Sequence, residues 1–84
     1  MNYRIIILDP VLKETRKFPR KDQQRISDAI DSLGADPFRG KKLEGEYAGG
    51  WAIRVWPYRI IYTIQKHLVT VTVVKIGHRR DVYR

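Results

Sequence analysis

The C-terminal half of the chain has the most regular pattern of apolar and polar positions. Three runs rich in β-branched and aromatic residues cover about residues 50–56, 58–65 and 68–77. This composition is typical of strands. A shorter apolar run at residues 2–8, "NYRIIIL", predicts another strand near the N-terminus. We therefore expect four strands.

Two helices are expected between the first strand and the other three. The first begins with Asp9 as N-cap and Pro10 at the first helical position, and it continues through "VLKETRKF". The second covers about residues 20–33 and ends at Gly34 as C-cap. The order βααβββ predicts a single α+β domain over residues 1–84, in which a two-helix hairpin packs on one face of an antiparallel-rich four-stranded sheet.

Residues 35–50, "ADPFRGKKLEGEYAGG", interrupt these periodic patterns. The segment is rich in glycine and charge, which predicts a loop. Leu43 and Tyr47 are the residues expected to attach this loop to the core.

The hairpin "GWAIRVWPYRIIYTI" places two arginines in an apolar setting. An even number of turn residues puts Arg54 directly opposite Arg59, with the neighbouring pairs Ile53 and Ile60, Val55 and Tyr58, and Trp51 and Tyr62. Like charges opposed on a sheet cost up to about 1 kcal/mol. A fold that keeps this pair suggests that an anion belongs between the two side chains.

Alternation along the strands divides the sheet into two faces. One faces the helices and carries Trp51, Ile53, Val55, Tyr58, Ile60 and Tyr62, whereas the other, here called the arginine face, carries Ala52, Arg54, Arg59, Ile61 and Thr63. In the last strand we expect Val74 and Ile76 in the core, and Lys75, Gly77 and Arg79 on the arginine face. A bulge in "TVTVVK" would reverse this assignment.

The formal charge of the chain is +8, and it is unevenly distributed. Residues 51–84 hold seven basic residues and one acidic residue, Asp81. Such a concentration of positive charge indicates a polyanionic partner, most often nucleic acid. The lack of cysteine excludes a disulfide scaffold and a thiolate metal site, and favours a reducing cytoplasm. No apolar run approaches the length that crosses a membrane.

Two stretches, "KKLEGEYAGGWAIRVWPYRIIYTI" and "VTVVKIGHRRDVYR", resemble the RelE/ParE superfamily of toxins, and its RelE branch most closely. The resemblance implies an endoribonuclease that enters the ribosomal A site and cleaves mRNA through attack of the ribose 2′-OH, with no metal or cofactor. It also implies inhibition by a cognate antitoxin protein, through which operator DNA would be bound indirectly.

The same resemblance assigns candidate site residues. Positions that are catalytic or contact RNA in RelE-like toxins correspond to Arg54, Arg59, Arg79 and Tyr83. Contacts to RNA or the ribosome are expected from Lys41, Lys42, Lys75 and Arg80. Many RelE toxins have a lysine where this chain has Ala52, which leaves the residue for proton transfer open between Tyr83 and His78.

Other functions are compatible with these residues. A ParE-type toxin would poison DNA gyrase by binding it and would need no anion site. An inactive homologue kept for antitoxin binding is a third possibility, which Ala52 allows. Arg54 and Arg59 would then be solvated strand residues that limit edge pairing.

Overall fold

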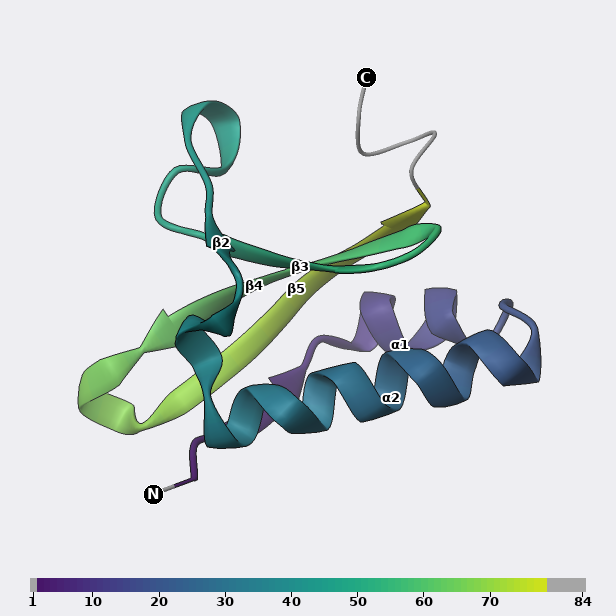
Figure 1. Cartoon of the computed structure of the whole chain (residues 1–84), viewed down its shortest axis with the longest axis horizontal. Coiled ribbons are helices and arrows are strands. Elements are labelled where there is room, and N and C mark those ends of the chain that lie inside the picture. Colours follow the sequence, from purple (N-terminus) through teal and green to yellow (C-terminus); the bar gives the residue numbers. More distant parts are fainter. Residues whose placement is uncertain (1, 79–84) are drawn as a thin grey trace.

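The apolar runs of the C-terminal half form the centre of one mixed sheet, which two helices cover on one face (Figure 1). The computed structural model describes residues 2–78. The strands are β1 (Arg4–Ile7), β2 (Lys41–Lys42), β3 (Trp51–Val55), β4 (Tyr58–Gln65) and β5 (Thr70–His78). The helices are α1 (Asp9–Thr15) and α2 (Arg20–Ala35), and three 3-10 turns are η1 (Pro37–Arg39), η2 (Gly45–Tyr47) and η3 (Lys66–Leu68).

The sheet has five strands in the order β1-β5-β4-β3-β2, so the α+β class is confirmed and the expected count of four strands is wrong. The additional strand, β2, pairs antiparallel with β3 through Lys41 opposite Ala52 and Lys42 opposite Trp51. Two consecutive lysines carry no alternation of apolar and polar residues, so only their pairing identifies the strand. At the other edge β1 pairs parallel with β5, which makes the sheet mixed.

Helix α1 begins one residue earlier than expected. The Leu8 carbonyl accepts the first helical hydrogen bonds, from the N–H groups of Val11 at 2.9 Å and Leu12 at 3.1 Å. The N-cap is therefore Leu8, which has no capping side chain, and the prediction that Asp9 is the N-cap is wrong. Asp9 instead lies in the first turn, where a carboxylate interacts favourably with the helix dipole.

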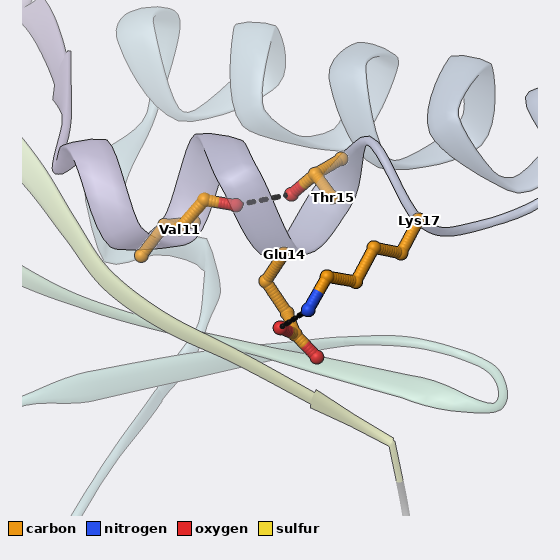
Figure 2. A network of polar contacts seen from close by, with 4 residues as sticks. All are labelled: Val11, Glu14, Thr15 and Lys17. Carbon is orange, nitrogen blue, oxygen red and sulfur yellow. Dashed lines mark hydrogen bonds and ion pairs between the residues drawn. The ribbon is translucent and has the colours of Figure 1, made fainter.

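Helix α1 ends at Thr15, three residues before the predicted end (Figure 2). The Thr15 hydroxyl donates to the Val11 carbonyl oxygen at 2.8 Å. Just beyond, the Lys17 ammonium lies 3.7 Å from a Glu14 carboxylate oxygen. A threonine hydroxyl that bonds four residues back competes with the backbone, and such bonds weaken helix ends.

Helix α2 extends through Gly34 to Ala35, so the prediction of Gly34 as C-cap is wrong. The Gly34 carbonyl accepts a hydrogen bond from the Tyr3 N–H at 2.7 Å, which ties the end of α2 to the start of β1. The C-cap is Asp36, and its carboxylate accepts from the Phe38 N–H at 3.2 Å as the chain enters η1. Neither helix among residues 2–78 is long and apolar enough to span a bilayer.

The predicted hairpin register is confirmed, with Arg54 opposite Arg59 and the neighbouring pairs in place. The last strand departs from the expected parity because β5 contains a bulge. Ile61 pairs with Lys75 but Tyr62 pairs with Val73, which leaves Val74 as the extra residue. Val73 is therefore fully buried in the core, Val74 is only partly buried, and the assignment of Val74 to the core is wrong.

The core lies between the sheet and the two helices. Its buried side chains from the helices and the sheet are Val11, Ile26, Ile30, Leu33, Ile53, Val55, Tyr58, Ile60, Tyr62, Val71, Val73 and Ile76. In β3, Ile53 and Val55 belong to this cluster and Trp51 packs against it, so Arg54 lies on the opposite face of the sheet. The loop that follows β2 rises on that side, away from the helices (Figure 1).

Candidate functional site

Arg54 and Arg59 are neighbours on the arginine face because β3 and β4 pair them directly. Their two-residue turn, Trp56 and Pro57, has the even length on which the register depends. Arg54 is exposed and Arg59 is partly buried. Cβ atoms of directly opposed residues lie about 5 Å apart, so both guanidinium groups can reach one anion.

A surface hollow of about 300 Å³ lies where β2 begins beside β3. It is lined by Arg39, Gly40, Lys41, Ala52, Ile53, Arg54 and Arg59, and we call it the cationic hollow. Four of these seven residues are cations and none is acidic. Arginine guanidinium groups bind phosphate bidentately and stay protonated, so the cationic hollow suits a phosphate group.

Tyr62 fixes the segment that forms one wall of the cationic hollow. Its hydroxyl donates to the Pro37 carbonyl oxygen at 2.7 Å, and the Gly40 backbone lies against the same hydroxyl. Burial of this fully enclosed side chain raises the pKa of Tyr62, because the phenolate would lose its hydration. The residues before β2 are therefore held against β4.

Gly40 is required for this close approach. A Cβ atom built there would lie 2.6 Å from the Ala52 carbonyl oxygen, and it would overlap the Tyr62 hydroxyl. Such a contact with backbone has no flexible partner to move aside. Glycine at this position lets Lys41 enter the sheet opposite Ala52.

His78 lies on the other face of the sheet from the arginines. It pairs with Tyr58, and the two rings meet edge to face with centroids 5.7 Å apart. Tyr58 belongs to the core, and its hydroxyl donates to Asp22 at 2.8 Å. Burial, and then this hydrogen bond, raise the pKa of Tyr58. The structure therefore does not bring His78 together with Arg54 and Arg59.

The predicted lysines are placed differently from one another. Lys41 lines the cationic hollow, whereas Lys42 pairs with Trp51 and so projects from the opposite side of β2. Lys75 lies on the arginine face opposite Ile61. Its ammonium donates to the Tyr47 hydroxyl at 3.3 Å and lies 5.9 Å from the centre of that ring.

The contact with Lys75 changes the expected role of Tyr47. Tyr47 is 37% exposed and lies outside the core, so the expectation that it attaches the loop to the core is wrong. Leu43 is partly buried, and its N–H donates to the Gly50 carbonyl oxygen at 2.9 Å. The loop after β2 is thus held to the sheet at its base by Leu43 and across the arginine face by Tyr47.

The model of a known family covers nearly the whole chain. It describes the ParE toxin of the type II toxin-antitoxin system parDE, and it matches residues 5–83. The chain belongs to the RelE/ParE superfamily of toxins. The match spans both helices, all of the sheet except Arg4, and the cationic hollow, so the family assignment applies to nearly the complete fold.

Individual relatives agree with this assignment. Toxin RelG of Mycobacterium tuberculosis is 30% identical over 86 residues, which is 100% of this toxin chain and 99% of the relative. The crystal structure of the RelBE2 toxin-antitoxin complex of Mycobacterium tuberculosis matches with a TM-score of 0.86 and 26% identity, covering 96% of this chain and 95% of the other. The archaeal RelE-RelB complex from Pyrococcus horikoshii OT3 matches with a TM-score of 0.83 and 26% identity, covering 98% and 100%.

Three predicted site residues of the toxin, Arg79, Arg80 and Tyr83, lie outside the described residues. The predicted parity of β5 still holds at Gly77, which pairs with Arg59.

The sequence-based prediction did not include Arg39, which lines the cationic hollow and also donates to the Ser32 hydroxyl. The basic run "RGKK" was the available signal. Within residues 2–78, no group of three or more His, Cys, Asp or Glu side chains is placed to hold a metal ion.

Proposed function

We propose that this toxin is a ribosome-dependent endoribonuclease that cleaves mRNA in the A site and thereby inhibits translation. The observation that carries the proposal is the cationic hollow, in which Arg54 and Arg59 face each other beside two further cations. A transition state of RNA cleavage carries extra negative charge on phosphate oxygens. Preorganised guanidinium groups stabilise such charge without moving.

In the proposed reaction the ribose 2′-oxygen attacks the adjacent phosphorus. The bond from phosphorus to the 5′-oxygen breaks, which yields a cyclic phosphate and a free 5′-hydroxyl. Arg54 and Arg59 hold the nonbridging oxygens, whose charge increases as the new bond forms. Guanidinium groups are poor proton shuttles because they do not deprotonate at working pH.

The proton that leaves the 2′-OH and the proton that the 5′-oxygen takes up need another group. Tyr83 is the candidate, and it can alternatively stack on a base to hold single-stranded RNA. His78 has less geometric support, because it lies edge-on to Tyr58 on the helix side of the sheet.

The partners follow from charge and from the relatives. The net charge of +8 and the lysines of the arginine face favour binding of mRNA and ribosomal RNA. The RelBE2 and RelE-RelB structures contain a toxin with its antitoxin. We propose that a cognate antitoxin likewise inhibits this toxin and that any contact with operator DNA is made through the antitoxin.

The test is induction of the toxin alone in cells, followed by mapping of mRNA 5′ ends. The proposal predicts new 5′ ends in phase with codons in translated messages. Intact mRNA accompanied by DNA breaks would instead identify a toxin of the gyrase-poisoning type. Intact mRNA without DNA damage would identify an inactive homologue.

A further inference from the structure

Strand β2 brings one lysine of the Lys41-Lys42 pair into the cationic hollow. Lys41 is directly opposite Ala52 in the antiparallel ladder, so both side chains leave the sheet on the same face. Ala52 and Arg54 are two residues apart on β3 and share that face as well. Lys41 is therefore the diagonal neighbour of Arg54, at a Cβ separation of about 7 Å.

The small side chain of Ala52 leaves the room that Lys41 needs. Ala52 is 4% exposed and forms the floor of the cationic hollow between Lys41 and Arg54. A flexible four-carbon stem on a neighbouring strand can extend over a methyl group. Gly40 and the Tyr62 hydroxyl hold the backbone just before Lys41 against the sheet, so the strand that carries Lys41 is fixed beside β3.

We propose that Lys41 is a catalytic residue that contacts the scissile phosphate together with Arg54 and Arg59, and that Lys42 has no part in this step. This rests on the proposed nuclease activity. During attack of the 2′-oxygen on phosphorus, the Lys41 ammonium hydrogen-bonds to a nonbridging oxygen as its charge grows, and it remains protonated throughout. Lys42 projects from the opposite side of β2, so its charge acts on RNA only at long range.

The first test compares Lys41→Ala with Lys42→Ala in single-turnover cleavage of mRNA on programmed ribosomes. At saturating toxin, Lys41→Ala is expected to cut about 10²-fold more slowly, the loss typical of one preorganised donor. Lys41→Ala removes a phosphate contact, so it should also weaken binding and reduce its salt dependence, whereas Lys42→Ala should change binding less. Lys42→Ala should retain most of the saturated rate, and Lys13→Ala on α1 should match the parent in both measurements.

Rescue experiments separate the position of the charge from the identity of the residue. Lys41→Arg should keep a rate within about tenfold of the parent, because its guanidinium reaches the same hollow. Combining Lys41→Ala with Ala52→Lys returns an ammonium to the same face from the opposite strand, and we expect partial recovery of the rate. Melting temperatures establish that each variant is folded, since Ala52 is buried.

Phosphate binding, which does not depend on cleavage, distinguishes the proposed role of Lys41 from the proposed nuclease activity. Inorganic phosphate is titrated into the free toxin while amide NMR shifts of Gly40 and Ala52 are followed. We expect these shifts to move, and the affinity for phosphate to fall at least threefold in Lys41→Ala but not in Lys13→Ala.

Absence of cleavage with this phosphate response intact would reject the nuclease activity while keeping the anion site. Equal saturated rates for Lys41→Ala and Lys42→Ala, or unchanged phosphate affinity in Lys41→Ala, would overturn the role of Lys41.

Discussion

At the scale of single residues, the cationic hollow is built from charges that repel one another. Arg54 and Arg59 are opposed on neighbouring strands, and Arg39 and Lys41 line the same space. Like charges directly opposed on a sheet interact unfavourably, by up to about 1 kcal/mol. A bound anion is attracted to all four cations, so the same arrangement provides both affinity and stabilisation of developing charge.

Gly40 gives the first prediction at this scale. Gly40→Ala should destabilise the toxin by at least about 2 kcal/mol, because the new methyl group meets the Ala52 carbonyl oxygen and the Tyr62 hydroxyl. The matched control is Gly34→Ala, where the nearest atom lies at an ordinary 3.4 Å and the helix gains a residue of higher propensity. Urea denaturation measures the free energy of unfolding of both variants. A Gly40→Ala variant as stable as the Gly34→Ala variant would contradict the close packing described for β2.

At the scale of secondary structure elements, two tyrosines of β4 connect the sheet to the rest of the fold. Tyr58 donates to Asp22 on α2, and its ring stacks on Phe18 with centroids 4.5 Å apart. Tyr62 holds the segment before β2 through the Pro37 carbonyl oxygen. Each phenol is buried and donates its proton to a partner, so each contact requires the neutral form.

These contacts predict a loss of stability at alkaline pH. The pKa of both tyrosines is raised above the ordinary 10.0 by burial, so the folded state keeps protons that the unfolded chain has released. Their contribution is complete below about pH 10, and it declines as the pH rises through the folded pKa. Urea denaturation between about pH 9 and pH 11 should show this decline, with a shallower slope in Tyr62→Phe. Equal slopes in Tyr62→Phe and the parent would count against the assignment.

The elements also show what the sequence could predict and what it could not. The hairpin register followed from the two-residue turn and from side-chain parity, which leave one pairing that buries Ile53 and Ile60 together. Strand β2 has only two polar residues, and the bulge at Val74 sits in a run that is β-branched on both faces. Neither carries a local pattern, because each is determined by the strand it pairs with.

The candidate site, too, could be predicted only in part from the sequence. Arg54 and Arg59 could be assigned to one face from alternation alone. The different faces of Lys41 and Lys42 could not be predicted from the sequence, and neither could the presence of Arg39 in the cationic hollow. Both follow from the position of β2 against β3. A loop prediction treats adjacent lysines as equivalent, whereas pairing places them on opposite faces.

At the scale of the whole molecule, the two faces of the sheet have separate tasks. The helices cover one face and bury the core (Figure 1), whereas the cationic hollow is lined by Lys41, Arg54 and Arg59 of the other face. Lys75 and Tyr47 connect the loop that follows β2 to β5 across the same face. Substitutions of the four cations that line the cationic hollow therefore leave the core side chains in place, and we expect them to change activity far more than stability.

The claim that the cationic hollow holds the scissile phosphate is tested most directly by a single-turnover rate. The rate is that at which Arg54→Gln and Arg59→Gln variants cleave A-site mRNA on programmed ribosomes. The matched control is Arg20→Gln, an exposed arginine at the start of α2. We predict a fall on the order of 10²-fold or more at saturating toxin for each hollow variant, with unfolding free energies within about 1 kcal/mol of the parent. The control should cleave at the parent rate. Folded Arg54→Gln and Arg59→Gln variants that cleave as fast as the control would contradict the claim that the cationic hollow holds the scissile phosphate.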